Sequence, residues 1–146
     1  MDTGVLTLER TFQASPQKVF DFVTKKQNLL KWWGPIGCYV DENHLDFSKI
    51  GSYFFVMVAP NGGRAKVSGK VLAVNAPYMV EFDMSMPGDE QCLRMSVVKF
   101  EIAANEQGGT DFKLTQTGLT SEEITFNRSN GWMSTLTRLA ALLEKN

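Results

Sequence analysis

The chain offers few side chains for acid–base or nucleophilic chemistry. It has a single histidine, His44, and two cysteines, Cys38 and Cys92. A Ser-His-Asp or Cys-His constellation would have to be built around that histidine. The segment VDENHLDF surrounds His44 with acidic residues, which is typical of a solvated loop, and the repeated His or Cys ligands of a zinc site are missing. We therefore expect no catalytic constellation and no metal site.

Motifs that would bind a nucleotide or a cofactor are also missing. No GxGxxG follows a strand pattern, no P-loop or HExxH occurs, and PNGG at residues 60–63 has the composition of a hairpin turn. The two cysteines are far apart and form no CxxC, which indicates two reduced, packed thiols in a cytoplasmic protein. No cofactor is expected, and any activity as an enzyme stays open.

One polar side chain shares a face with apolar ones. Gln116 has the same strand parity as Phe112 and Leu114. A buried amide without partners costs ~1–3 kcal/mol. Gln116 therefore either bonds a side chain of a neighbouring strand or orients a carbonyl or hydroxyl group of a ligand.

Composition limits the kind of partner. Of 146 residues, 43% are hydrophobic, and 15 Lys and Arg balance 16 Asp and Glu. The longest basic block is the pair Lys25-Lys26, which argues against a nucleic-acid groove and a polybasic membrane anchor. The N-terminus does not resemble a signal peptide, and no apolar run is long enough to span a membrane. We expect one cytoplasmic domain over residues 1–146, as a monomer or a homodimer.

Strand and helix signals show which elements would position these residues. VLTLERTFQA alternates apolar and polar positions and predicts a strand over residues 5–14. Ser15 as N-cap and Pro16 at the first helical position predict a helix. A second short helix is predicted over residues 26–32, ended by Gly34-Pro35.

The middle of the chain predicts an antiparallel meander of five or six strands. Turn chemistry at residues 60–63 and 75–77 separates strands in which Val67, Val71 and Ala73 share a face. The segment CLRMSVVKFEI changes parity near Val97-Val98, which predicts a β-bulge. Residues 120–146 then change to a helical period, with Thr120 or Ser121 at the start and a kink or a packing role for Gly131.

Six segments carry a resemblance to a known family. RTFQASPQKVFDFVT, KWWGPIG, GSYFFVMVAPNGG, SGKVLAVNAPYMVEF, TDFKLTQTGL and NGWMSTLTRLAALL resemble the activator-of-heat-shock-protein-90-ATPase homologues, within the START and birch-pollen-allergen (SRPBCC) superfamily. The resemblance runs from about Thr7 to Leu143, and Ser52 departs from it where a second glycine is usual. It implies an α+β helix-grip fold. Such a fold has a curved antiparallel sheet of six or seven strands wrapped around a long C-terminal helix, with two short helices between the first and second strands.

A strongly curved sheet covered by one helix leaves a space that either side chains or a ligand must fill. Trp32 and Trp33 cannot bury alike, because adjacent helical residues point about 100° apart. We assign Trp33 to the cavity mouth, although both rings can be structural. The family pattern places Phe54 and Val56 inside, and Met84, Met86 and Met95 would give an adaptable wall. The residues predicted to bind a ligand are Trp33, Phe54, Val56, Val71, Phe82, Met84, Met95, Phe112, Leu114, Gln116, Trp132 and Leu136.

Three functions are compatible with this pattern. An apolar inner wall favours binding of a hydrophobic small molecule, such as a lipid, a polyketide or a flavonoid. An enzyme acting on a bound polyketide-like ligand would need polar groups converging inside the cavity. A chaperone-assisting role, linked to a stress response by the family resemblance, would need an exposed patch.

Overall fold

The computed structural model describes residues 4–89 and 91–144, without the side chains of residues 128–130. Strands, short α-helices and one π-helical turn follow one another along this part of the chain. In order, these elements are β1 (Gly4–Phe12), α1 (Pro16–Thr24), α2 (Lys26–Leu29), β2 (Tyr39–His44), β3 (Gly51–Val58), β4 (Arg64–Asn75), β5 (Met79–Ser85), β6 (Met95–Ala104), β7 (Thr110–Leu119), α3 (Ser121–Phe126), η1 (Asn127–Trp132) and α4 (Met133–Leu143).

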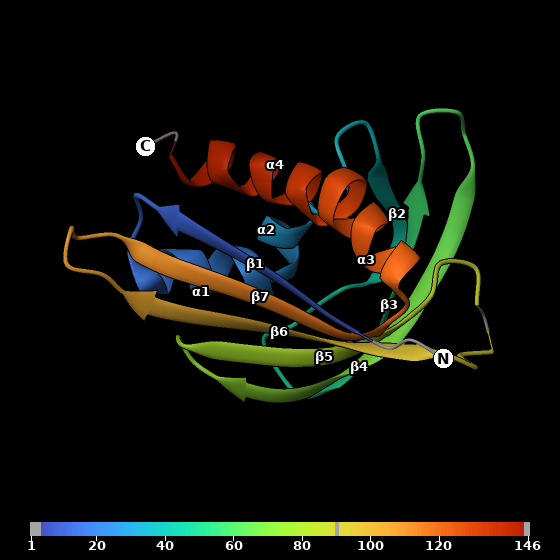
Figure 1. The fold of residues 1–146 in the computed structure, drawn as a ribbon, viewed down its shortest axis with the longest axis horizontal. Coiled ribbons are helices and arrows are strands. Elements are labelled where there is room, and N and C mark those ends of the chain that lie inside the picture. Colours follow the sequence, from blue (N-terminus) through green and yellow to red (C-terminus); the bar gives the residue numbers. More distant parts are fainter. Residues whose placement is uncertain (1–3, 90, 145–146) are drawn as a thin grey trace.

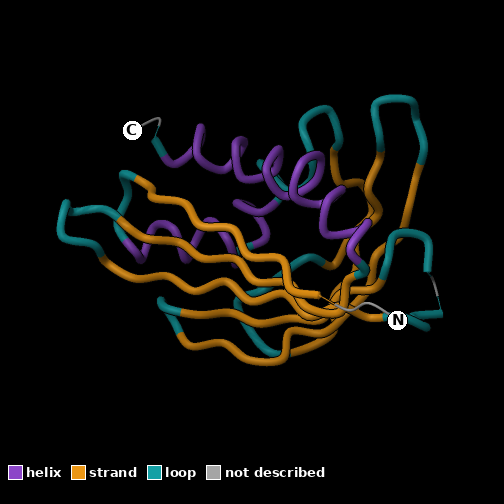
Figure 2. The backbone as a smooth tube through the Cα atoms, viewed as in Figure 1, coloured by secondary structure: helices purple, strands orange, loops and turns teal. Residues whose placement is uncertain are grey.

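All seven strands form one antiparallel sheet in the order β1-β7-β6-β5-β4-β3-β2. The sheet curves, and the helices lie together on its concave side (Figures 1 and 2). The hairpin of β3 and β4 rises at one end of the sheet beside α3 (Figure 1), and this end is called the raised end of the sheet below. This is the helix-grip fold, as the sequence predicts. None of the described helices is long and apolar enough to cross a membrane.

The short helices begin where the sequence places them. The side chain of Ser15 accepts a hydrogen bond from the backbone N–H of Lys18 at 3.2 Å, and Pro16 occupies the first turn of α1. Ser15 thereby satisfies one of the donors that a helix start leaves free. The second helix is shorter than expected, because α2 ends at Leu29 and the chain continues in turns through both tryptophans.

Most of the space between the sheet and α4 is filled by side chains. Buried aromatic and aliphatic residues of every strand except β2 lie there with residues of α1 and α4, and the half-buried Val40 of β2 packs against them. The largest fully buried members are Trp32, Phe12, Phe47, Phe82, Phe100, Phe112, Leu6, Leu29, Leu45, Leu114, Leu119 and Leu136. Any ligand cavity is therefore confined to one part of the interior.

Strand details differ from the sequence predictions in two places. The predicted bulge near Val97-Val98 is wrong, because β6 pairs with both neighbours in continuous register. Its apparent parity change arises because the strand begins only at Met95, while Leu93 lies in the preceding turn and is 81% exposed. A register shift instead lies in β4 between Val71 and Ala73, so that Val74 packs against the core.

His44 belongs to a strand and not to a loop. It is the last residue of β2, where it pairs with Phe54 of β3, and its side chain is exposed. β2 is the edge strand beside β3, and its register shifts between Val40 and Asn43. Acidic residues along it hid the strand pattern, because charged side chains are usual on exposed edges.

The C-terminal helix contains three segments. Thr120 caps α3 in a reciprocal capping box with Glu123. The π-helical turn η1, which contains Gly131, then separates α3 from α4. Such turns widen a helix locally and are frequent at functional sites. Gly131 therefore marks a change of helix type, at the level of the sheet's raised end.

Candidate functional site

A cavity of about 550 Å³ lies between the raised end of the sheet and the start of the C-terminal helix. Strands β3, β4 and β5 form one wall, and α3, η1 and the first turn of α4 form the other. The loop after α2 closes the side. Its lining residues are Trp33, Gly34, Pro35, Cys38, Phe55, Met57, Ala65, Val67, Met84, Ser85, Met86, Pro87, Gln116, Glu122, Glu123, Phe126, Asn127, Gly131, Trp132 and Thr135.

Trp33 forms the aromatic floor of this cavity. Its ring lies edge-on to Phe47, Phe55 and Trp132, with centroid distances of 5.4, 5.9 and 5.6 Å. Edge-to-face contacts of this kind add about 0.5–1.5 kcal/mol each to the effect of burial. Only 3% of Trp33 is exposed, so this ring belongs to the floor of the cavity and does not lie at its mouth, where the sequence analysis placed it. Trp32 lies fully in the core and donates its indole N–H to the carbonyl of Phe22 at 2.8 Å.

The loop that carries Trp33 is held against α4 by polar contacts. The guanidinium of Arg138 donates to the carbonyls of Gly34 and Cys38 at 2.9 and 3.2 Å. The hydroxyl of Ser134 accepts the backbone N–H of Ile36 at 2.7 Å. Gly34 has a φ of +103°, and a Cβ there would lie 2.6 Å from Cε of Met57. The positive φ favours glycine at this position, whereas the flexible end of the Met57 side chain could shift to make room for a Cβ.

A chain of hydrogen bonds runs along the inner wall. Trp132 donates its indole N–H to Oε1 of Gln116 at 2.7 Å, and Nε2 of Gln116 donates to Oγ of Ser96 at 2.9 Å. Ser96 in turn donates to the carbonyl of Met84 at 3.4 Å. Gln116 and Ser96 are each 1% exposed. The predicted bond from Gln116 to a neighbouring strand is thus present, and the amide reaches the C-terminal helix as well.

Two carboxylates lie at the rim. Glu123 forms an ion pair with Arg94, which also donates to the carbonyl of Gly118 at 2.9 Å. The hydrogen bonds from Arg94, with those from Thr120, lower the pKa of Glu123 to about 2. Glu123 is therefore ionised and engaged at neutral pH, whereas Glu122 is exposed.

The structure brings four of the predicted site residues together in the cavity. Trp33, Met84, Gln116 and Trp132 line it. Five others do not line it, since they are buried in the packed interior: Val71, Phe82, Phe112, Leu114 and Leu136. Strand parity identified inward positions in β5 and β7 but could not tell a packed position from one beside a void.

The remaining three predicted residues, Phe54, Val56 and Met95, lie on the opposite side of the sheet, where Val56 pairs with Lys66. Phe54 lies beside Lys66, whose ammonium is 4.9 Å from its ring centroid, and Met95 belongs to the same outer hollow. The expectation that Phe54, Val56 and Met95 point inward is wrong. In β3, Tyr53, Phe55 and Met57 face the interior instead, because the strand is apolar on both faces and its parity was ambiguous.

Several lining residues were not predicted. Phe55 and Met57 were missed with the parity of β3, and Ala65 lies opposite Met57 across the hairpin. Pro87 follows the end of β5 and Phe126 lies in α3, so strand alternation could not have identified either residue. Asn127, the first residue of η1, lines the cavity beside Gly131 of the same π-helical turn.

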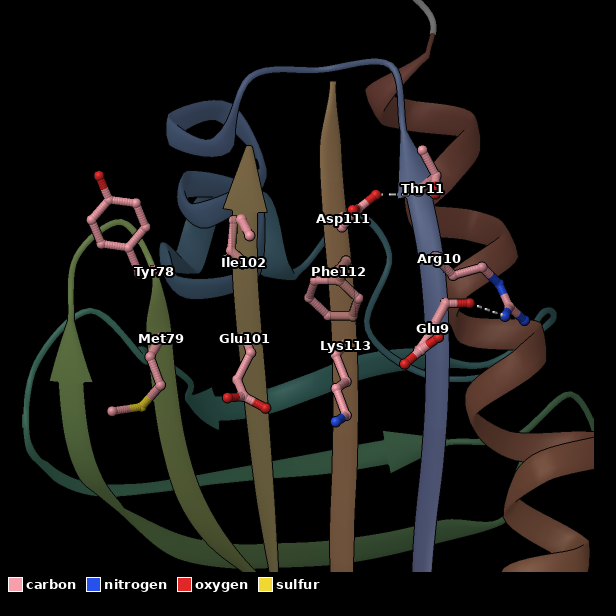
Figure 3. A pocket seen from close by; sticks show the side chains of 11 residues that line it. Glu9, Arg10, Thr11, Tyr78, Met79, Glu101, Ile102, Asp111, Phe112 and Lys113 are labelled. Carbon is pink, nitrogen blue, oxygen red and sulfur yellow. Dashed lines mark hydrogen bonds between the residues drawn. The ribbon is translucent and has the colours of Figure 1, made fainter. Parts of the chain in front are cut away.

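A larger hollow, about 930 Å³, lies on the outer face of the sheet at β1, β7, β6 and β5. Glu9, Lys113 and Glu101 lie in a row across three strands there and point away from the helices (Figure 3). Alternating charges at paired positions stabilise a solvated sheet face. Within the described residues, no group of three or more His, Cys, Asp or Glu side chains is placed to hold a metal ion. Because charged side chains line the outer hollow and mainly apolar ones line the inner cavity, the inner cavity is the better candidate for an apolar ligand.

Comparisons with known proteins agree with this architecture. A family model described as Activator of Hsp90 ATPase homolog 1-like protein matches residues 13–144. No curated protein matches the chain. The crystal structure of the AHSA1 protein from Silicibacter pomeroyi is 36% identical, with a TM-score of 0.86 over 96% of this chain and 97% of that one.

More distant structures share the fold. A protein from Chromobacterium violaceum is 21% identical, with a TM-score of 0.83 over 97% of this chain and 98% of that one. A protein from Nitrosomonas europaea is 20% identical, with a TM-score of 0.79 over 97% and 94%. The family model spans nearly the whole chain, so this protein belongs to the family of Activator of Hsp90 ATPase homolog 1-like proteins.

Proposed function

We propose that this protein binds a hydrophobic small molecule in the cavity between the raised end of the sheet and the C-terminal helix. The helix-grip fold generally binds hydrophobic ligands. The observation that carries the proposal is the apolar cavity of about 550 Å³ beside a fully packed core. Ligand sites in proteins typically measure ~300–1,000 Å³ and are lined mainly by apolar and aromatic side chains.

The lining is adaptable on one side and rigid on the other. Met57, Met84 and Met86 face the aromatic floor formed by Trp33 and Trp132. Methionine side chains have three rotatable bonds and adjust to irregular shapes, whereas packed indole rings do not. This combination suits a lipid-like, polyketide-like or flavonoid-like molecule with an aromatic or branched apolar body.

The polar residues of the lining favour binding over acid–base catalysis. No His, Lys or Arg belongs to the described lining. Glu123 is engaged by Arg94, and Gln116 is an amide, which does not ionise near neutral pH and so cannot act as a general acid or base. A general acid or base needs a group that titrates near the working pH and reaches the substrate. We therefore place ligand binding before an enzymatic role.

A cavity-filling variant tests the proposal directly. Ala65→Leu adds three carbon atoms to the cavity wall without removing a buried side chain. We expect it to weaken binding of the neutral probe N-phenyl-1-naphthylamine about tenfold, equivalent to ~1.4 kcal/mol. Probe fluorescence titration measures the affinity. Ala103→Leu is the matched control, because Ala103 is an exposed strand residue at the outer hollow.

Two results would overturn the proposal. The probe and a panel of apolar compounds fail to bind the unaltered protein, or A65L and A103L bind the probe equally well. Circular dichroism of both variants shows whether the sheet is intact. If A65L is unfolded, the smaller change Ala65→Val takes its place.

A further inference from the structure

The orientation of the Gln116 amide is fixed at both ends. The indole N–H of Trp132 can only donate, so the amide atom that it contacts at 2.7 Å is the oxygen. The amide nitrogen therefore faces Ser96, at 2.9 Å, and the hydroxyl proton of Ser96 is directed to the carbonyl of Met84. These contacts leave no freedom for the amide to turn over.

Gln116 has hydrogen-bonding capacity beyond these contacts. Its NH₂ group carries two hydrogens, and the bond to Ser96 uses one of them. The side chain is 1% exposed and lines the cavity. A buried N–H without an acceptor is more costly than a carbonyl with one lone pair unused. The group best suited to occupy this position is therefore a hydrogen-bond acceptor inside an otherwise apolar surrounding.

The charges around the cavity disfavour an anionic ligand. Glu122 and Glu123 are the charged residues among the described residues of the lining. Two cations near the cavity, among the side chains that the structure describes, are already engaged: Arg94 bonds Glu123 and a backbone carbonyl, and Arg138 bonds the carbonyls of the loop. A carboxylate entering the cavity would lose its hydration and find no free cation in the described lining.

We propose that the cavity selects an uncharged apolar molecule with one acceptor group, such as a ketone or an ester, whose oxygen takes a hydrogen bond from Nε2 of Gln116. This inference rests on the proposed function and specifies its ligand class. The apolar body of the ligand lies on Trp33 and among the methionines. Its acceptor lies beside the Trp132–Gln116 contact, where a hydrocarbon would leave the amide hydrogen unpaired.

Ligands of matched length test the charge requirement on the unaltered protein. Methyl nonanoate and nonanoate are titrated against bound N-phenyl-1-naphthylamine at pH 7.5. We expect the ester to displace the probe at a concentration at least about tenfold lower than the carboxylate, because the anion must be desolvated without a partner. Equal potency of the two, or a more potent carboxylate, would contradict the inference and leave apolar binding intact.

A second pair of ligands and two variants test the hydrogen bond. The ratio of affinities for 2-nonanone and nonane is measured in W132F and in the double variant Q116L/W132F. Both variants lack the indole N–H at position 132, so loss of the Gln116 amide leaves no unpaired donor there. The two variants differ only at position 116. We expect the ratio to fall about five- to tenfold on loss of the amide. The same ratio is also compared between the unaltered protein and Q116L, in which Trp132 is retained. An unchanged ratio in both comparisons would exclude Gln116 as the donor, whereas failure of every compound and the probe to bind W132F and the unaltered protein would reject the proposed function itself.

Discussion

At the scale of single residues, Gln116 links three parts of the molecule. It lies on β7, bonds Ser96 on β6 and accepts from Trp132 at the end of the π-helical turn. The sequence showed that it shares a face with apolar residues, and the structure adds its partners. Trp132 lies on a different element, so this second contact depends on the fold as a whole.

Removal of the amide alone is expected to destabilise the protein. Gln116→Leu leaves the buried indole N–H of Trp132 without an acceptor, and we expect a loss of ~1–3 kcal/mol in the free energy of unfolding. Urea denaturation of Q116L, W132F and Q116L/W132F measures this. The double variant should lose less than the sum of the two single losses, because the indole donor is absent. Strict additivity would show that the two side chains are not coupled.

Gly69 provides a second test at this scale. A Cβ at this position would collide with the backbone carbonyl of Asp83, which also accepts the hydroxyl of Tyr53 at 2.7 Å. Gly69→Ala should therefore push β4 and β5 apart and lower the thermal midpoint of unfolding. Gly62→Ala is the control, since a Cβ at Gly62 would meet no atom within 4 Å, although its φ is +89°. A smaller loss for G69A than for G62A would contradict the role of close approach.

At the scale of elements, the loop between α2 and β2 is positioned by the C-terminal helix. Arg138 and Ser134 of α4 bond its backbone, and Trp33 on the same loop forms the cavity floor. The start of that helix is fixed separately, through the ion pair of Glu123 with Arg94. Helix and loop thus hold opposite sides of one cavity.

Loss of the Arg138 guanidinium should loosen the loop. Arg138→Ala removes charged donors from several loop carbonyls, and we expect a loss of about 2 kcal/mol in stability. Hydrogen exchange should become faster at the amide of Cys38, which bonds the carbonyl of Pro35. Arg10→Ala is the matched control, because Arg10 bonds the carbonyl of the adjacent Glu9. Equal exchange at Cys38 in both variants would refute the proposed clamp.

The start of α3 should respond to acid. The pKa of Glu123 is lowered to about 2, so its contribution is fully present above the ordinary glutamate pKa of 4.5. That contribution is lost as the pH falls through about 2. Amide chemical shifts of Ser121–Phe126 between pH 5 and pH 2 follow the loss. The same acid transition in Glu123→Gln would assign it to another group.

Sequence patterns located most elements but not all of their faces. Alternation in β5 and β7, the Ser15-Pro16 start of α1 and the capping signal at Thr120 were sufficient, because each depends on neighbouring residues. The parity of β3 and the shift in β4 were not readable, since both depend on pairing across the sheet. The position of the cavity was unreadable for the same reason: it is a mismatch between elements that are distant in sequence.

At the scale of the whole molecule, one end of the interior is packed and the other is hollow. The helices cover the concave side of the sheet along its length (Figure 2), yet the β3–β4 hairpin stands away beside α3. The hollow end lacks side-chain contacts that a bound ligand can supply, so binding there can raise the stability of the protein. This division separates the residues that hold the fold from those that line the cavity.

A bound ligand is therefore expected to stabilise the whole protein. At a free concentration one hundred times the dissociation constant, binding adds ~2.7 kcal/mol to the free energy of unfolding. For a chain of this size, that corresponds to a rise of roughly 5–10 °C in the unfolding midpoint. Differential scanning calorimetry of the unaltered protein with methyl nonanoate measures the shift. A65L should show a smaller shift at the same ligand concentration, and a rise of equal size would place the ligand elsewhere.

Trp33 belongs to both halves of this interior, because its ring contacts the packed residues Phe47 and Phe82 as well as the hollow. A substitution of Trp33 that changes the cavity also changes the packing of the core, so it is expected to lower the stability of the fold. Selection for a new ligand can act more freely on the other lining residues, such as the methionines of the sheet wall and Phe126 of α3. Among relatives, we expect the tryptophan at this position to be retained, while the other lining side chains vary with the ligand that each relative binds.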